Sequence, residues 1–552
     1  MPHSVLNFNV GVLGHIDSGK TSLSKALSTI ASTASFDKNP QSRERGITLD
    51  LGFSSFTVPI PDHIKAQDCH LESLQFTLVD CPGHASLIRT IIGGAQIIDL
   101  MMLVVDITKG VQTQTAECLV LGEITCNHMI VILNKIDLLP DDKREASIQK
   151  MSKKILKTLE RTKFKNSVII PVSAKPNSDE TNAVPIGIDS LVECLKHHTY
   201  IPERSPSGSF VFAVDHCFAI KGQGTVMTGT ILQGQVSVSD VVEIPKTKIT
   251  RKVKSIQMFK KPIQTAMQGD RVGICVTQFD PKDLERGVVC SPGYIETTDS
   301  VIASVSKIPY FKGVCKTGSK FHVSIMHDTV ISKCSFFAPR TGLGTCLNEF
   351  NFDLDYVHLD EIPEESSAMP SVDPKVDSIF ALLQLANPVI LNKDAVYIAS
   401  RLETDIHANV CRLAFHGKIL AVSSSKQNSE IFPTLKVYKE KMKVGTVDRM
   451  VNEYQVIVRD LFKKETNIQI FANLKVLLST GEEGIIEGSF GQSGKVNVRV
   501  PNGLSEKAIS SLKISKKGKR DQIEKDKLDQ ITVELKFKKY IYGNKKKIFQ
   551  SK

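Results

Sequence analysis

The sequence has no CxxC pair, no uninterrupted apolar run of membrane-spanning length and no secretory leader pattern. Its twelve cysteines, spread over 552 residues, exclude a disulfide-rich scaffold and an obvious zinc ribbon, since both need closely spaced pairs. The longest apolar stretch, residues 93–107, is interrupted by Asp99, so we expect no segment that crosses a bilayer. Residues 1–20 have no basic region before their short apolar run and no small-residue cleavage site, which argues against a secretory signal. These absences predict a thiol-reduced protein of the cytoplasm.

The rest of the composition is that of an ordinary globular chain, with 41% hydrophobic and 23% charged residues. At ~150 residues per domain, the length predicts three or four domains. The net charge is +11, and +9 of it lies in residues 501–552, where fifteen Lys and Arg face six Asp and Glu. A nearly neutral body with a basic end predicts a polyanionic partner for the last domain, and a solvated lysine-rich terminus is the alternative.

Residues 1–202 alternate buried-strand and amphipathic-helix patterns. The expected strands are 8–13, 75–80, 100–106, 129–134 and 168–172, and the expected helices are 22–30, 114–126, 143–161 and 188–198. This alternation is typical of βαβ units, so we predict an α/β domain with a mostly parallel sheet. Such sheets bind ligands at the carboxyl ends of their strands.

The remainder of the chain is β-rich and predicts three further domains. Residues 203–293 alternate apolar and polar positions between frequent glycines, which predicts an antiparallel β-barrel. Residues 294–422 predict a second β-barrel. Within it, residues 349–377 hold nine acidic residues against one lysine, which we interpret as a mobile acidic surface insertion. Residues 432–552 predict a basic, β-rich C-terminal domain.

Residues 14–21, GHIDSGKT, match the phosphate-binding pattern GxxxxGK[ST] between an expected strand and an expected helix. The glycines let backbone N–H groups wrap phosphate oxygens beside the positive end of the helix. Lys20 would reach the β- and γ-phosphates, and Thr21 would give its hydroxyl to Mg²⁺. A chance glycine-rich turn is the alternative, which the strand–loop–helix context disfavours. The residues expected to bind the phosphates are Gly14, His15, Asp17, Ser18, Gly19, Lys20, Thr21 and Ser22.

Three further motifs follow expected strands. Residues 80–84, DCPGH, place Asp80 within reach of the Mg²⁺ shell and the Gly83 N–H toward a γ-phosphate. Residues 134–137, NKID, supply a carboxylate that accepts from guanine N1–H and N2–H₂, a pair that adenine does not offer. Residues 173–175, SAK, close the other side of the base. The expected base-binding residues are Asn134, Lys135, Asp137, Ser173, Ala174 and Lys175.

Residues 45–48, RGIT, complete the set. Thr48 is placed to coordinate Mg²⁺ and to sense the γ-phosphate, so its loop should be ordered with GTP and looser after hydrolysis. The expected Mg²⁺ ligands are therefore Thr21, Thr48 and Asp80, and the expected cofactors are GTP or GDP with Mg²⁺. The motifs, in this order and at strand ends, indicate a GTPase.

The motif set resembles the translational GTPase family, in which RGIT and DCPGH accompany the phosphate-binding loop and a β-barrel follows. Five strings extend this to a resemblance to the eukaryotic selenocysteine-specific elongation factors: residues 41–53, 212–218, 221–226, 269–274 and 462–469. The resemblance covers nearly the whole chain and is least distinctive in the acidic insertion and at the extreme C-terminus. The chain differs from elongation factor Tu in having a fourth domain, and from the bacterial selenocysteine factor in lacking a string of winged-helix repeats.

The resemblance implies a GTP-dependent elongation factor that delivers selenocysteinyl-tRNA to the ribosome for UGA recoding, with hydrolysis of GTP to GDP and phosphate. It implies that His84 positions the attacking water, and that slow intrinsic hydrolysis is accelerated by the ribosome. A capping role at the next helix is the alternative for His84. We expect the chain to act as a monomer and to have no membrane partner.

The resemblance also implies a selenocysteine pocket formed by Asp215, His216 and Arg271. A selenol is more acidic than a thiol, so selenocysteine is largely an anionic selenolate at neutral pH, whereas serine is neutral. A cation beside the side chain therefore separates the two. We expect Arg271 and His216 to face the selenolate, while Asp215 orients one of them or meets the α-amino group. A barrel-rim turn with a surface cation is the alternative.

The basic C-terminal domain is expected to meet RNA or an RNA-binding adaptor, and by resemblance to help couple the factor to the mRNA element that recodes UGA. Its aromatic residues interleave with lysines, which suits phosphate contact with base stacking. The same pattern equally suits a strand with one buried aromatic face and one solvated lysine face. Residues 515–520, SKKGKR, fit a nuclear-import signal or a solvated loop; the loop is favoured, and the nucleus stays open as a second location.

Two other functions stay open. One is a general elongation or initiation GTPase that carries another tRNA, such as the initiation-factor γ subunit, whose zinc-knuckle cysteines are absent here. The other is a GTP-switched RNA or protein scaffold with negligible hydrolysis, which His84 argues against. Identifying the amino acid on the bound tRNA would distinguish a selenocysteine-specific factor from a general tRNA carrier. Measuring GTP turnover with ribosomes would distinguish it from a scaffold with negligible hydrolysis.

Overall fold

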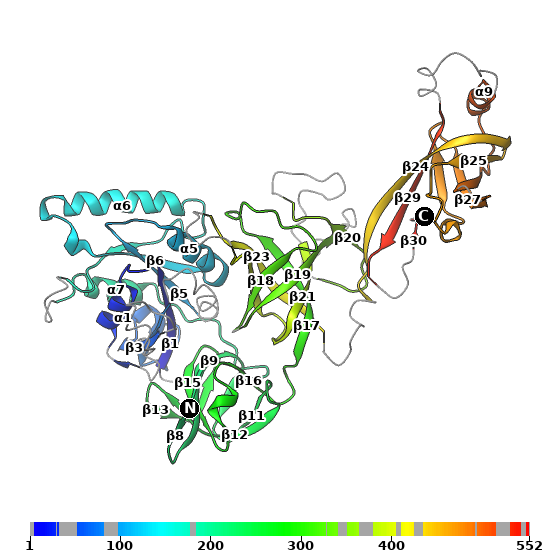
Figure 1. Cartoon of the computed structure of the whole chain (residues 1–552). Helices are drawn as coiled ribbons and strands as arrows, with labels where there is room; N and C mark the ends of the chain where they lie inside the picture. Colours follow the sequence, from blue (N-terminus) through cyan, green and yellow to red (C-terminus); the bar gives the residue numbers. More distant parts are fainter. Residues whose placement is uncertain are drawn as a thin grey trace. The chain divides into compact units, whose positions relative to one another are not determined.

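The computed structural model describes most of the chain as two compact units (Figure 1). The first unit comprises Met1–Ser335 and Phe380–Gln427, and the second comprises Phe336–Ile379 and Asn428–Lys552. The structure describes residues 5–28, 30–31, 52–81, 98–176, 184–326, 328–339, 350–363, 379–403, 410–423, 434–491, 494–514, 530–542 and 548–550.

A seven-stranded sheet opens the first unit, in the order β2-β3-β4-β1-β5-β6-β7. Its strands are β1 (Val5–Gly14), β2 (Ile30–Ala31), β3 (Gly52–Pro59), β4 (Ser73–Asp80), β5 (Leu100–Asp106), β6 (His128–Asn134) and β7 (Ile169–Pro171). Its helices are α1 (Lys20–Leu27), α3 (Asp62–Lys65), α5 (Thr113–Thr125), α6 (Arg144–Leu159) and α7 (Ile188–His197). Neighbours from β4 to β7 are parallel, which confirms the predicted α/β class, whereas β3 pairs antiparallel with β4.

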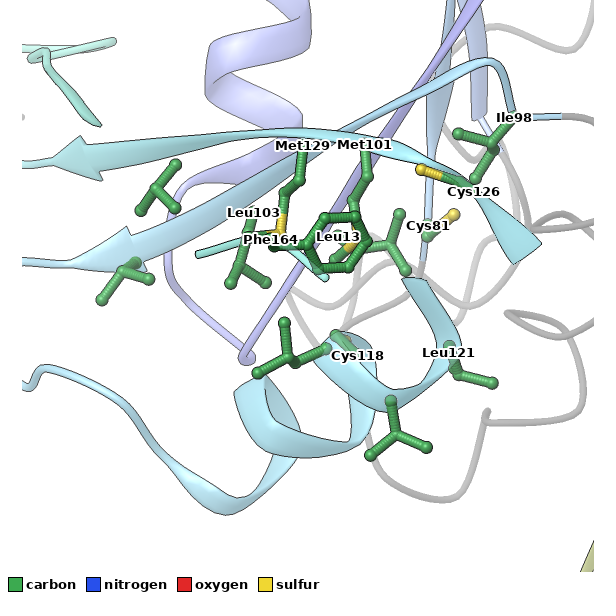
Figure 2. Packing of buried hydrophobic residues seen from close by; sticks show 14 of the residues in the cluster. Leu13, Cys81, Ile98, Met101, Leu103, Cys118, Leu121, Cys126, Met129 and Phe164 are labelled. Atoms are coloured by element: carbon green, nitrogen blue, oxygen red, sulfur yellow. The ribbon is translucent and has the colours of Figure 1, made fainter. Parts of the chain in front are cut away.

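Both faces of this sheet are buried, which explains why its strands read as continuous apolar runs. On one face, Phe8 of β1 belongs to a cluster with Leu23 of α1, and both side chains are 0% exposed. Figure 2 shows the cluster on the other face, where strand residues meet α5; its labelled members include Leu13, Met101, Leu103, Cys118, Leu121 and Met129. Gly122 lets α5 approach, since a Cβ there would lie 2.4 Å from the Met101 Sδ. Each fully buried large apolar side chain contributes about 1.5–3 kcal/mol, so this packing fixes the strand ends that carry the site.

The predicted barrel after the α/β domain is also confirmed. Its sheet has the order β11-β16-β8-β9-β15-β12-β13, and pairing of β11 with β12 closes it. The strands are β8 (Val211–Ile220), β9 (Gly224–Gln233), β11 (Val241–Ile244), β12 (Ile249–Met258), β13 (Lys261–Ile263), β15 (Arg271–Val276) and β16 (Gly287–Cys290), with β10 (Gln235–Ser237) pairing β14 (Thr265–Met267) beside them. The β8–β9 register shifts between Val214 and His216, so Asp215 is the extra residue of a β-bulge.

A second antiparallel barrel completes the first unit, as predicted. Its strands run in the order β18-β22-β23-β17-β21-β19, and β18 pairs with β19 to close it. They are β17 (Thr297–Lys307), β18 (Lys320–Ile325), β19 (Asp328–Pro339), β21 (Ile379–Ile390), β22 (Val396–Ser400) and β23 (Leu413–Val422). The unit boundary falls within β19, after Ser335.

The second unit is β-rich, as the sequence predicts. It contains β20 (Tyr356–Leu359), β24 (Val437–Asn452), β25 (Gln455–Arg459), β26 (Lys475–Leu478), β27 (Glu483–Phe490), β28 (Lys495–Arg499), β29 (Thr532–Tyr540), β30 (Ile548–Phe549) and α9 (Glu506–Ile514). The order β24-β25-β28-β27-β26-β29 closes through pairing of β24 with β29. Its core contains Phe471 and Phe537, whose rings pack edge to face at 5.4 Å.

The interpretation of residues 349–377 as a mobile insertion is wrong for residues 350–363. Strand β20 lies in this segment, and pairs antiparallel with the end of β19 and parallel with β24. Tyr356 is 1% exposed, and its ring stacks on Phe350 at 5.3 Å. The carboxylate of Asp355 accepts hydrogen bonds from the Tyr540 hydroxyl (2.7 Å) and the Lys538 ammonium (3.3 Å). The acidic segment therefore packs against the basic strand β29. Residues 364–378 lie outside the described part of the chain.

Within the described residues, no helix combines the length and the apolar character that crossing a bilayer requires.

Candidate functional site

The loop between β1 and α1 has a backbone shape that two glycines of the phosphate-binding pattern allow. Gly14 and Gly19 have φ of 150° and 89°. A Cβ on Gly14 would lie 2.2 Å from the Val104 carbonyl oxygen, and one on Gly19 would lie 2.2 Å from the Asn134 amide nitrogen. Neither position can carry a side chain without moving its neighbours. The loop ends where α1 begins at Lys20, so the positive end of that helix points at the loop.

Lys20 lies inside this loop rather than in solvent. It is 6% exposed, and its ammonium donates to the carbonyl oxygen of His15 at 2.8 Å. Burial lowers the pKa of Lys20, and the nearby carboxylate of Asp80 opposes that shift. Burial likewise lowers the pKa of His15, with the positive charges of Lys109 and Lys20 adding to the effect. The loop therefore concentrates positive charge where a phosphate would neutralise it.

Two of the three expected Mg²⁺ ligands are in contact. The hydroxyl of Thr21 donates to a carboxylate oxygen of Asp80 at 2.7 Å, which joins the start of α1 to the end of β4. A hydroxyl beside a carboxylate is the hard oxygen donor set that Mg²⁺ accepts, with phosphates and waters as its other ligands. The residues present therefore fit the ion. Thr48, Gly83 and His84 lie outside the described residues.

Asn134 holds the two sides of the base site together. It is 2% exposed, its amide nitrogen donates to the Ser18 carbonyl oxygen at 2.9 Å, and its amide oxygen accepts from the Ala174 N–H at 3.1 Å. Asp137 accepts a hydrogen bond from the Ser173 hydroxyl. Three predicted motifs, from three different strand ends, therefore meet at one edge of the sheet, as the parallel topology requires.

Asp106, which no sequence motif marks, also lies at this site, in contact with Lys135. The ammonium of Lys135 pairs with the carboxylate of Asp106 at 2.8 Å. Burial would raise the pKa of Asp106, but hydrogen bonds from Lys135 and Thr108 outweigh it and lower that pKa. No motif marks Gln114 either, and its side-chain oxygen accepts from the Ile16 N–H at 3.1 Å. The signal for Asp106 was its place at the end of β5, beside the other strand-end residues.

The other expected contacts lie at the same edge. His15 and Ser22 are half-buried, Asp17 is exposed with φ of 59°, and Lys175 is exposed directly after the buried Ala174. The structure thus brings together every described residue of the predicted nucleotide site.

A second site lies where the first barrel meets the α/β domain. Arg271 is 5% exposed, and its Nη1 donates to the Asp215 carboxylate at 2.5 Å and to the Thr230 hydroxyl at 3.3 Å. The β-bulge aims Asp215 at this guanidinium, and Phe53 of β3 lies under it, with the Arg271 Cζ 3.0 Å from the ring centroid. Burial lowers the pKa of Arg271 and Asp215 opposes that change, so the side chain remains a cation.

One nitrogen of the buried guanidinium makes no hydrogen bond to the described residues. The Arg271 Nη2 has no hydrogen-bond partner among the described residues. Arg271 also lines a cavity of about 120 Å³, together with Val226, Thr228, Gly273 and Cys275 among others. Asp215 and His216 do not line it, although His216 pairs with Thr228 in the β8–β9 ladder. The arrangement leaves a buried cation with one donor unused beside a space the size of a small side chain.

Four family models match the chain in order. They are the elongation factor Tu GTP binding domain (residues 6–201), elongation factor Tu domain 2 (224–291), the third domain of eukaryotic selenocysteine-specific elongation factors (302–417) and the eEFSec C-terminal RIFT domain (433–546).

Whole-chain comparisons agree with these matches. The chain is 52% identical to a selenocysteine-specific elongation factor of Mus musculus, over 99% of both chains. It is 32% identical to one of Methanocaldococcus jannaschii, over 88% of this chain and 93% of that protein. The crystal structure of translation elongation factor SelB from Methanococcus maripaludis with the GTP analogue GppNHp matches 96% of this chain and 98% of its own, with 26% identity and a TM-score of 0.66.

Proposed function

Because the chain belongs to the family of selenocysteine-specific elongation factors, GTP-dependent proteins that deliver selenocysteinyl-tRNA, we propose that three groups of its residues hold the nucleotide, the metal ion and the cargo. The chain is a translational GTPase. Acceleration of its GTP hydrolysis by the ribosome is part of the proposal.

The nucleotide group comprises the phosphate-binding loop and the base-binding motifs. Lys20 leaves the His15 carbonyl oxygen to meet the β- and γ-phosphates, a short movement because its ammonium already lies inside the loop. Asp137 accepts from the guanine N1–H and N2–H₂, and Ser173 and Asn134 hold that carboxylate and the loops around it. A base that left Asp137 unpaired would be rejected strongly.

The metal group comprises Thr21, Asp80 and Thr48. When bound, Mg²⁺ neutralises charge on the β- and γ-phosphates. The Thr21–Asp80 contact supports the assignment of these two residues. For Thr48, and for His84 as the residue that positions the attacking water, the support is the motif alone.

The cargo group comprises Arg271, Asp215 and His216. Asp215 accepts a hydrogen bond from one nitrogen of the guanidinium and holds that end of it, which favours the orienting role for this carboxylate over contact with the α-amino group. Arg271 lines the adjoining cavity and its Nη2 makes no hydrogen bond to the described residues, so a selenolate placed there would be attracted by this cation, and a neutral serine hydroxyl would gain less from it. His216 is assigned a supporting role at the pocket rim.

One observation carries the cargo assignment: a buried arginine with an unused donor lines a small cavity. The test incubates the tagged chain with total aminoacyl-tRNA and either GTP or GDP, recovers the complexes and identifies the esterified amino acid. Selenocysteine should be enriched with GTP only. Arg271→Ala should remove that enrichment, while Arg251→Ala, a control on the same barrel, should keep it. Equal weakening of seryl and selenocysteinyl complexes by Arg271→Ala would contradict the pocket.

The C-terminal domain is proposed to engage RNA or an RNA-binding adaptor at the mRNA element that recodes UGA. Its basic charge supports this, as does its exposed lysine Lys536 on β29. The factor is proposed to act as a monomer in the cytoplasm, with the nucleus as a second location. A general tRNA carrier is the competing function, and it predicts that the recovered tRNA bears many amino acids.

A further inference from the structure

Phe53 and Arg271 join two domains of the first unit. Phe53 is on β3 of the α/β sheet, and Arg271 opens β15 of the barrel. The ring is 0% exposed and the arginine 5% exposed, so water is excluded from the contact between them. A cation held over an aromatic face is attracted by the ring quadrupole, and the attraction is stronger when both are desolvated.

The ring of Phe53 holds the guanidinium of Arg271 in addition to the hydrogen bonds that the barrel supplies. Within the barrel, Asp215 and Thr230 both bond the Nη1 of Arg271. Those two bonds fix one end of the guanidinium, and the flat ring of Phe53 fixes its plane. The direction of the unused Nη2 is thus set jointly by the barrel and by the α/β sheet.

The other side of Phe53 leads to the nucleotide site. In the β3–β4 ladder, Phe53 pairs with Val79 and Gly52 pairs with Asp80. Asp80 accepts the hydrogen bond from Thr21 at the start of α1. The strand partner of Phe53 is therefore the residue next to Asp80, whose carboxylate is assigned to Mg²⁺. Phe53 also follows Thr48 by five residues in the sequence.

We propose that Phe53 is a positioning residue that couples the nucleotide site to the selenocysteine pocket by holding the guanidinium of Arg271. This inference rests on the proposed cargo pocket. With GTP bound, the Asp80 end of β4 and its partner β3 hold the ring under the guanidinium, and the guanidinium stays beside the cavity proposed for the anionic side chain. Since coupling between two binding sites is reciprocal, bound selenocysteinyl-tRNA must tighten GTP binding by the same factor by which GTP tightens tRNA binding.

A purely structural role for Phe53 makes a different prediction, and the chain supplies a matched control. Phe53 belongs to the apolar cluster on one face of the sheet, so any smaller residue there also removes packing. Phe56 is on the same strand, is 4% exposed and stacks on Phe76 at 5.0 Å in the cluster on the opposite face. Phe56→Leu therefore removes a comparable ring that touches no cation.

The experiment compares the full-length wild type with Phe53→Leu, Phe53→Met, Phe53→Tyr and Phe56→Leu. The dissociation constants for selenocysteinyl-tRNA and seryl-tRNA are measured with GppNHp and with GDP, and the thermal midpoint of each variant is recorded. Two ring-free substitutions are made at Phe53 so that the result does not depend on the folding of one.

The coupling role predicts that the ring-free variants lose about thirtyfold of the preference for selenocysteine over serine, the size expected of a desolvated cation–π contact. They should also lose GppNHp-over-GDP preference for selenocysteinyl-tRNA by a similar factor. Phe53→Tyr, which keeps the aromatic face, should retain both ratios. Phe56→Leu should retain both ratios even if its thermal midpoint falls as far.

Two results overturn the inference alone. One is a discriminating wild type whose two ratios are unchanged in the ring-free variants. The other is an equal loss of both ratios in Phe53→Leu and Phe56→Leu, which would assign the effect to packing. A wild type that binds the two tRNAs equally would overturn the proposed pocket, and this inference with it.

Discussion

The carboxylate of Glu117 on α5 accepts two hydrogen bonds from the guanidinium of Arg412, one from Nε at 3.0 Å and one from Nη2 at 2.9 Å. The two residues are 295 positions apart, and they are 6% and 4% exposed. Glu117 belongs to the α/β domain and Arg412 to the second barrel. A bidentate pair at such a junction fixes the orientation as well as the distance of the two groups.

Removal of one partner of this pair should destabilise the first unit strongly. Arg412→Met would leave the Glu117 carboxylate buried without its cation, which costs about 3–5 kcal/mol of the free energy of unfolding. Urea denaturation followed by circular dichroism, with hydrogen exchange of the α5 amides, measures the change. The double variant Glu117→Leu with Arg412→Met should recover most of the loss, because no charge is then left unpaired.

The exposed pair of Lys196 with Glu193 provides the control. Glu193→Gln should change the free energy of unfolding by at most about 1 kcal/mol, since solvent screens that pair. An Arg412→Met effect no larger than this would show that the buried pair is not what holds the junction.

Asn134→Ala should weaken GTP binding although Asp137, and not Asn134, is the residue proposed to recognise the base. The side chain of Asn134 instead holds two loops of the site together. The substitution removes the bonds to the Ser18 carbonyl oxygen and the Ala174 N–H. Two hydrogen bonds at ~1 kcal/mol each correspond to about thirtyfold in affinity if both loops must be held for binding. Titration with a fluorescent GTP analogue measures this. Asn127→Ala, at an exposed acceptor of Lys163, is the control, and equal affinities of the two variants would contradict the clamp.

The gathering of the predicted motifs at one edge of the sheet could be predicted because each motif is local. Residues 14–21 and 134–137 carry their chemistry within a few positions, and the parallel sheet brings strand ends together whatever lies between them. The clamp by Asn134 was not predictable in the same way. Its partner Ser18 is 116 positions distant, and the contact depends on how closely two loops approach.

Contacts between domains could not be predicted from the sequence either, because they also join residues that are far apart in the chain. No periodicity in β3 marks Phe53 as the partner of an arginine in the barrel, and no motif contains Glu117 or Arg412. The prediction of a mobile acidic segment was wrong for residues 350–363 because composition measures charge but not pairing. Asp355 lies among acidic residues, yet it bonds Lys538 and Tyr540 of a basic strand, and that pairing favours order.

Acid should destabilise the first unit through His416 of β23. Burial lowers the pKa of His416, and the positive charge of Lys163 adds to the shift. The unfolded chain, with an ordinary histidine pKa of about 6.5, therefore binds the proton more readily than the folded chain does. The free energy of unfolding should fall as pH drops below about 6.5 and be fully recovered above it. In urea titrations at pH 5 to 7, His416→Gln should reduce the dependence of the free energy of unfolding on pH. An unchanged pH dependence would mean that another group causes the loss of stability in acid.

Asp137→Asn should exchange the base preference of the chain rather than abolish nucleotide binding. The carboxylate accepts from two guanine donors in the proposed pose, and an amide offers a donor in place of one acceptor. GTP binding should fall by at least a hundredfold, because buried polar groups of the base are left unpaired. Xanthosine triphosphate, which has an oxygen where guanine has its amino group, should bind better than GTP to the variant. Competition titrations with the two nucleotides measure the ratio for the wild type and the variant. Since Ser173 bonds Asp137, Ser173→Ala should weaken GTP without favouring the xanthine nucleotide. Loss of both nucleotides in Asp137→Asn would mean that the residue supports the loop and does not read the base.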